Sequence, residues 1–420
     1  MKAVMVFYRR CFWLLLALLV SQSGSASAEE PVELPNKPAH ESSHDSLVPP
    51  WGRDLDEEHG EAAHHEEHGE AEKHRWRFLG EYLLMFTKND RIPALLTTGP
   101  TADARPGAIG REFTRVLYSD AIDFEERHGG RFTLEMPLGE DWSLAANYFL
   151  LGARDVGPKR TSPGSPVLAR PFFDVVNNRE DSFLVSFPGV ASGSIRIVAD
   201  SFLQGAELNL QRRYQPHEHR RVVLFAGLRY LDLDEELNIT ETSFVVSGPL
   251  AGRRVGVLDG FETDNDFFGG QVGAAYELDY KRFTFNVTSK VALGNVHETV
   301  AVRGRTVIDT TPVTDVPAGL FALSTNSGRF SRDRFAVVPE VSAKLGLHVS
   351  DRLMIFGGYS YIYWSNVVRP GEQIDRNLNP NLIPTSATFG GPAVPRQPAA
   401  SFQTSDYWLQ GMIFGFELRY

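Results

Sequence analysis

Charged side chains recur at alternate positions of strand-like segments from residue 76 onward, opposite to apolar side chains. Because successive side chains of a strand point to opposite faces, these charges share one face of each segment. They are Glu81, Arg131, Glu135, Glu207, Arg229, Glu277, Lys290, Glu340, Lys344, Glu417 and Arg419. If the segments close into a barrel around this face, the charges set ion selectivity in a wide pore. In a narrow barrel they must pair across the lumen, because a buried unpaired charge is costly.

Histidines interleaved with carboxylates form a second group that could do chemistry. Residues 29–74 contain seven of the twelve histidines. Weak binding of Zn²⁺, Ni²⁺ or Cu²⁺ is the chemistry available to four of them: His59, His64, His65 and His68. The zinc-protease spacing H-E-x-x-H is absent from residues 59–68, where His65-Glu66 is followed by Glu67-His68. We favour the alternative interpretation, a solvated linker, and predict no cofactor apart from this weak metal binding.

The sequence patterns of serine hydrolases, phosphate-binding loops and basic nucleic-acid-binding domains are missing. The chain has no G-x-S-x-G elbow and no phosphate-binding Gly-rich loop, and its one cysteine, Cys11, lies in the N-terminal segment. The formal net charge is −11, and residues 29–74 alone carry fourteen acidic against three basic side chains. We therefore expect neither enzymatic activity nor nucleic-acid binding.

The N-terminal segment predicts export. Residues 1–28 combine a basic start, an apolar run over 11–20 and the small-residue site Ala26-Ser27-Ala28, as in a cleaved signal peptide. The apolar run is too short to span a membrane as a helix. Residues 29–74 are acidic, rich in histidine and poor in apolar residues, and we predict that they form a disordered arm. The folded domain is then expected over 75–420.

Ten segments alternate apolar and polar side chains with period two. They are 76–87, 131–138, 142–151, 201–212, 221–231, 266–279, 282–295, 334–347, 353–364 and 406–420. Most have the roughly ten residues that a tilted strand needs to cross hydrocarbon, whereas soluble strands average about five or six. The pattern predicts an all-β, antiparallel up-and-down transmembrane barrel, in preference to a soluble β protein. Segment 353–364 has aromatic residues on both faces, so its facing stays open.

The connections alternate between two kinds. Four are short, at 138–141, 214–220, 279–281 and 349–351, and five are long, at 88–130, 152–200, 232–265, 296–333 and 365–405. Short periplasmic turns and long extracellular loops are typical of an outer-membrane barrel. The extended stretches 243–246 and 253–257 either form a hairpin above the membrane or raise the strand count from ten to twelve. Ten strands predict a narrow or plugged lumen, because about eight are just filled by side chains.

Several stretches resemble a family of planctomycete outer-membrane β-barrel porins, the seventh class of that kind. Those that carry the resemblance include 80–86, 91–100, 186–194, 204–210, 227–236, 290–297, 328–340, 363–376 and 411–420. The most specific is Tyr363-Trp-Ser-Asn-Val-Val-Arg-Pro-Gly-Glu-Gln-Ile-Asp-Arg376. The resemblance covers residues 75–420 and implies a porin-like barrel in the outer membrane, with no catalytic residues and no defined solute.

The loop that begins at residue 365 has two interpretations. Arg369, Glu372, Asp375 and Arg376 could line a constriction if the loop folds into the lumen, with Pro370-Gly371 as its turn. We favour the alternative, a rigid extracellular loop held by internal salt bridges.

The last strand suggests how the protein reaches its membrane. Phe416, Leu418 and Tyr420 share its apolar face and resemble a C-terminal signal read by the barrel-assembly machinery. The expected partners are this machinery and outer-membrane lipid, while no feature specifies an oligomeric state. The preferred functional prediction is limited passive diffusion of small solutes through a narrow lumen. The alternative is a structural or surface barrel with a plugged lumen and no transport.

Overall fold

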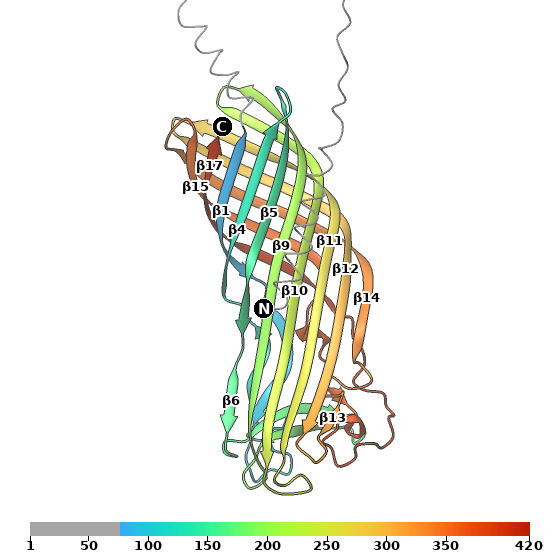
Figure 1. Ribbon diagram of the computed structural model, residues 1–420. Coiled ribbons are helices and arrows are strands. Elements are labelled where there is room, and N and C mark those ends of the chain that lie inside the picture. The colour runs from blue at the N-terminus through green and yellow to red at the C-terminus, as the bar shows by residue number, and fades with distance from the viewer. Residues whose placement is uncertain (1–75) are drawn as a thin grey trace, which may run out of the picture. The chain divides into compact units, whose positions relative to one another are not determined.

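The computed structural model describes residues 76–420, and ten long antiparallel strands form a closed ring (Figure 1). The ring strands are β1 (Arg77–Thr87), β4 (Glu126–Pro137), β5 (Trp142–Val156), β9 (Ala191–His217), β10 (Arg220–Val245), β11 (Arg254–Tyr280), β12 (Phe283–Ile308), β14 (Gly328–His348), β15 (Leu353–Val368) and β17 (Thr404–Arg419). The last strand closes on the first, from Arg77 opposite Arg419 to Thr87 opposite Leu409. The predicted ten-stranded antiparallel barrel is confirmed. The predicted signal peptide and acidic arm lie outside the described residues.

The two ends of the barrel differ, as the alternation of connections predicted. At the turn end, which also holds the C-terminus, residues 138–141, 218–219, 281–282 and 349–352 join neighbouring strands. The long connections all leave from the opposite end, which we call the loop end. In outer-membrane barrels the short turns face the periplasm and the long loops face outward.

Four neighbouring ring strands are much longer than predicted. β9, β10, β11 and β12 have 26 or 27 residues and run on toward the loop end beyond the other strands (Figure 1). The prediction of loops over 232–265 and most of 296–333 is therefore wrong. Stretches 243–246 and 253–257 belong to the β10–β11 hairpin, in which Ser243 pairs with Val255, so the ring has ten strands and not twelve. The short strands β6 (Lys159–Ser162) and β13 (Thr314–Val316) add to β9 and β12 outside the ring.

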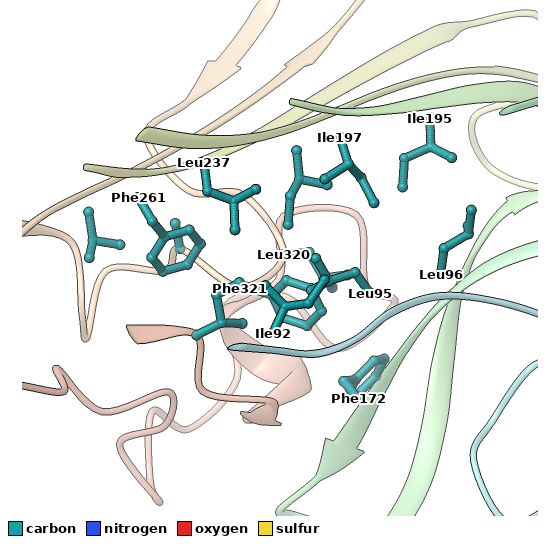
Figure 2. Packing of buried hydrophobic residues seen from close by; sticks show 14 of the residues in the cluster. Ile92, Leu95, Leu96, Phe172, Ile195, Ile197, Leu237, Phe261, Leu320 and Phe321 are labelled. Carbon is teal, nitrogen blue, oxygen red and sulfur yellow. The ribbon is translucent and has the colours of Figure 1, made fainter. Parts of the chain in front are cut away.

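A second sheet, contributed by three long connections, lies at the loop end. It contains β2 (Asp90–Thr98), β3 (Arg115–Ile122), β7 (Leu168–Asp174), β8 (Arg179–Ser186) and β16 (Asn377–Leu378), while η1 (Gly371–Gln373) and η2 (Pro380–Leu382) flank β16. Its apolar side chains form one cluster with those on the inner faces of the long ring strands, and Figure 2 shows Leu95 and Phe172 on one side of it and Ile197 and Leu237 on the other. Burying each such side chain contributes about 1.5–3 kcal/mol. We call this cluster the loop-end core.

Outward side chains form an apolar belt around the turn-end half of the ring. Phe132, Leu228, Val272 and Phe414 are each 48–58% exposed, as lipid-facing positions require. The structure also settles the facing of 353–364. Phe356, Ile362 and Trp364 point inward and Ile355 and Tyr359 point outward. Within residues 76–420, no helix is long and apolar enough to cross a membrane.

Candidate functional site

The charges singled out in the sequence lie together inside the turn-end half of the barrel. All eleven face inward, with side chains at most 19% exposed. Ten of them line a cavity of about 190 Å³ that they share with Arg77. Arg229 is fully buried and lies outside that lining. Alternation along each strand therefore brings together charges that are far apart in the sequence.

The deepest charges pair across the lumen as well as between neighbouring strands. Lys290 Nζ on β12 lies 2.6 Å from Glu207 Oε1 on β9, across the lumen, and 3.2 Å from Oε2 of Glu340, its register partner on the neighbouring strand β14. Arg229 Nη2 on β10 lies 2.8 Å from Glu340 Oε2. Arg131 contacts Glu340 from a further strand, at 3.5 Å. Such a pair is costly to break, because the remaining partner is left charged and buried.

A second set of pairs lies nearer the turn end. Arg77 bridges Glu417 at 2.9 Å and Glu135 at 3.3 Å. Three further contacts complete the set: Arg213–Glu135 at 3.1 Å, Arg221–Glu277 at 3.2 Å and Arg419–Glu417 at 2.7 Å. The remaining predicted charges, Lys344 and Glu81, join strands β14 and β1 at 2.5 Å. The predicted set of lumen charges did not include Arg77, Arg213 or Arg221, and Arg213 lies one residue beyond the predicted segment 201–212.

An apolar layer fills the lumen directly beyond these charges. It is contributed by every ring strand except β4 and comprises Leu83, Met85, Phe149, Leu151, Leu203, Leu231, Leu233, Phe267, Ala292, Val296, Ala336, Val338, Ile362, Trp364, Val367, Tyr407, Leu409 and Ile413. Each of these is at most 4% exposed. Strand β4 has Gly129 here, where a Cβ would lie 2.7 Å from a methyl carbon of Leu151. The sequence analysis missed this layer, although apolar residues on both faces of 353–364 were a signal for it.

The stretch over 365–376 turns into the lumen, so the favoured interpretation of an outer loop with internal salt bridges is wrong. A bulge at Ser365–Asn366 shifts the register of β15 against β17. Beyond it Val367 and Val368 are fully buried and Arg369 is 1% exposed. Bulges commonly redirect a strand in this way.

Arg369 holds this inward segment to two other parts of the protein. Its Nε and Nη2 donate to the two carboxylate oxygens of Glu235 on β10, at 2.7 and 2.6 Å, and Nη1 donates to the carbonyl of Lys88. The Gly371 N–H donates to Asp90 Oδ2 at 2.9 Å. The other predicted partner, Arg376, instead reaches Glu180 on β8 at 2.8 Å. These contacts fix the segment at Arg369, at Gly371 and at Arg376.

A second buried arginine ties the two sheets together at the loop end. Arg170 on β7 lies 2.6 Å from Asp259 on β11 and 3.3 Å from Glu241 on β10. The other carboxylate oxygen of Asp259 accepts the backbone N–H groups of residues 320–322, at 2.8–3.0 Å. Arg369 also lies 3.9 Å from Asp90, so each of these two arginines faces two carboxylates. Burial raises the pKa of Asp90 and of Glu241 to about 7 in each case, with the buried arginine partly opposing the shift.

The remaining predicted residues are those of the assembly signal and the metal-binding histidines. The terminal residues Phe416, Leu418 and Tyr420 point outward, and the Phe416 ring packs 6.0 Å from that of Phe78. The predicted metal-binding histidines, His59, His64, His65 and His68, lie outside the described residues. Metal binding by the arm and recognition of the terminal strand both remain predictions.

Comparisons with solved structures find outer-membrane proteins of low similarity. The outer membrane protease OmpT from Escherichia coli is 9% identical with a TM-score of 0.40, and the match covers 83% of this chain and 97% of that one. A FadL homologue from Pseudomonas aeruginosa is 6% identical with a TM-score of 0.22, covering 82% and 90%. The toluene transporter TbuX of Ralstonia pickettii is 8% identical with a TM-score of 0.18, covering 83% and 90%. These values are too low to transfer any activity to this chain.

The family comparison is more specific. None of the curated proteins compared with the chain matches it. Residues 78–420 match the family described as "Putative beta barrel porin-7 (BBP7)", which is nearly the whole of the described fold. This chain therefore belongs to the beta barrel porin-7 family of outer-membrane barrels.

Proposed function

We propose that this protein is a closed outer-membrane barrel that acts as a structural or surface element of the cell envelope, and that no solute crosses it along the barrel axis. The apolar layer across the lumen is the observation that carries this proposal. It joins nine of the ten ring strands through side chains at most 4% exposed. An apolar constriction built from buried side chains opposes the passage of ions and polar solutes.

Two further layers support closure. On the turn side the charges that line the cavity are paired with one another, so that they satisfy each other rather than stand free to attract ions. On the loop side the loop-end core covers the barrel, and Arg369 and Arg170 tie it to the ring strands. A ten-stranded barrel is also close to the size at which side chains fill the interior. The preferred prediction from the sequence, limited passive diffusion, is therefore the less favoured function.

A surface role explains why the long connections are built into an ordered structure. Residues from three connections build the second sheet, and the longest ring strands extend to support it. In an outer-membrane barrel this end faces outward, so the proposal gives the loop end the surface role. A barrel with this role needs a stable anchor in the membrane and a rigid outer part, and it needs no open channel.

Planar-bilayer recording on residues 29–420 tests the proposal. We expect no stepwise conductance from the wild-type chain. A variant with Phe267→Ser and Trp364→Ser puts two polar side chains into the apolar layer and should show small, flickering steps. A heat-dependent gel shift verifies that each protein is folded. Stable, ion-selective steps from the wild type would support the diffusion hypothesis and overturn this one.

A further inference from the structure

The hydrogen-bonded wall of the barrel has a seam between β14 and β15. Their ladder runs from His348–Met354 to Glu340–Ile362 and stops there. β14 continues for a further twelve residues paired with β12, as far as Gly328 opposite Val302. β15 continues paired with β17, as far as Val368 opposite Thr404. Beyond Glu340, β14 and β15 therefore remain part of the barrel wall, but they are no longer paired with each other.

Pro339 explains where the ladder ends. The N–H of Val337, two residues away, points toward β15, since it donates to Ser365 Oγ at 2.9 Å. The backbone of a strand repeats every two residues, so the nitrogen of Pro339 faces β15 as well. Proline has no N–H to donate, and it is found in sheets at edges and where a ladder ends. The next backbone hydrogen bond across the seam cannot form.

Two side chains replace the missing backbone bonds. Ser365 Oγ accepts the N–H of Val337, and Asn366 Nδ2 donates to the carbonyl of Phe335 at 2.9 Å. Both residues belong to the bulge of β15, where Asn366 has a φ of +56°. The seam is thus closed by two side-chain bonds in place of a continuous ladder. Opening it leaves the pairing of β14 with β12 and of β15 with β17 intact.

The seam separates two apolar environments. On its outer side Phe335 is 62% exposed and Val341 is 45% exposed, within the lipid-facing belt. On its inner side lie Ala336 and Val338, both fully buried, and Trp364 at 2% exposure. The indole Nε1 of Trp364 is buried and has no hydrogen-bond partner. An unpaired buried donor is costly, and it is satisfied by any acceptor that arrives beside it.

We propose that this seam is a lateral binding site for a single-chain amphiphile of the fatty-acid class, taken up from the surrounding membrane. Its acyl chain lies between β14 and β15 beside Pro339, and its carboxyl oxygen accepts the N–H of Trp364. The ligand must come from the membrane, because the site lies in the lipid-facing belt and only a membrane component reaches this face. A single chain needs a smaller separation of the two strands than a two-chain phospholipid does. The site opens through the wall rather than along the barrel axis, and it shares Trp364 with the apolar layer.

Quenching of tryptophan fluorescence by bromine tests the site. The probe is 9,10-dibromostearate, added to residues 29–420 in phospholipid nanodiscs, and the comparison probe is a phospholipid carrying the same brominated chain. We expect saturable quenching by the fatty acid that disappears in Trp364→Phe, and little contribution of Trp364 to quenching by the phospholipid. Equal, non-saturable quenching by both probes would show lipid contact alone and overturn the proposal.

Variants on the two sides of the seam should act in opposite directions. Pro339→Val restores the N–H, extends the ladder and should weaken binding of the fatty acid by about tenfold. Pro137→Val, at the turn end of β4, is the matched control and should leave binding unchanged. Ser365→Ala with Asn366→Ala removes the two closing bonds and should speed the onset of quenching. If the folded Pro339→Val protein binds like the wild type, or if the double variant shows no faster onset, the seam is not the route.

Discussion

Arg229 and Glu340 form an ion pair in the middle of the barrel, with Arg229 Nη2 2.8 Å from Glu340 Oε2 and both side chains at most 4% exposed. The pair joins β10 to β14, which are separated in the ring by β11 and β12. It therefore acts as a strut across the lumen and not as a contact within the wall. Lys290 and Glu207 extend it to a cluster in which each charge has an opposite neighbour.

Loss of this strut should destabilise the barrel strongly. Arg229→Ala leaves Glu340 and Glu207 with one fewer cation in a buried site, and we expect a loss of about 3–5 kcal/mol in the free energy of unfolding. Urea titration in detergent, followed by intrinsic fluorescence, measures it. Arg282→Ala, in an exposed turn, is the control and should change stability by less than about 0.5 kcal/mol. Equal effects of the two variants would contradict the strut.

The pinned segment after β15 should be released by removing Arg369. Arg369→Ala breaks the paired bonds to Glu235 and the bond to Lys88, so the connection over 370–403 should be cleaved faster by protease. The matched control is Arg305→Ala, which loses only an exposed pair with Asp315. Bilayer recordings on Arg369→Ala should still show no conductance, because every side chain of the apolar layer is retained, although Tyr407 loses the guanidinium that lies 5.3 Å from the centre of its ring. Cleavage at the wild-type rate would show that other contacts hold the start of this connection.

Stability of the loop end should fall as pH rises. Asp90 and Glu241 lie beyond the apolar belt, and burial raises the pKa of each to about 7 from ordinary values of 3.8 and 4.5. The folded state therefore holds these protons more tightly than the unfolded state does. Their contribution is complete below about pH 4 and is lost progressively up to about pH 7, by at most about 1.4 kcal/mol per pH unit and per group.

Hydrogen exchange at pH 5 and pH 8, corrected for the intrinsic rate, measures this change. Protection of the loop-end parts of β2 and β10 should be greater at pH 5, while the turn-end strands serve as the internal reference. Glu241→Gln keeps the shape of the side chain and removes one titrating group, so it should reduce the difference for β10. Exposed Glu140→Gln is the control and should leave the difference unchanged. A larger protection at pH 8 would reverse the sign and refute the assignment.

Deletion of Tyr420 should impair assembly more than it affects the folded barrel. Tyr420 points outward and is 76% exposed, so its loss removes little packing, although its N–H also bonds the Trp76 carbonyl at 2.9 Å. If the barrel-assembly machinery reads the terminal strand, the truncated chain should reach the outer membrane at a reduced level, measured by fractionation. The protein that does arrive should show a normal heat-dependent gel shift. Val349→Ala, in an exposed turn, is the control and should assemble normally.

Alternation predicted the ring because lipid imposes a local rule. Each strand must place apolar residues outward, so the facing of Phe132 against Arg131, or of Phe414 against Gly415, follows from position alone. Beyond the lipid the rule reverses. Outward positions such as Asp232 and Asp234 become acidic, while Leu233 and Leu237 point inward. The acidic residues and glycines of 232–265 were therefore mistaken for a loop, although the same strands continue.

The sequence by itself determined the ten lipid-crossing segments, the facing of all of them except 353–364 and the difference between the two ends, because these depend on residues two apart. Only the tertiary structure decided what the strands enclose. The pairing of Lys290 with Glu207, the contact of Phe267 with Trp364 in the apolar layer and the pairing of Arg369 with Glu235 each join residues at least 80 positions apart. Such contacts depend on the register of the closed ring. That register decides whether the inward face is a channel or a packed interior, and here it produces a packed interior.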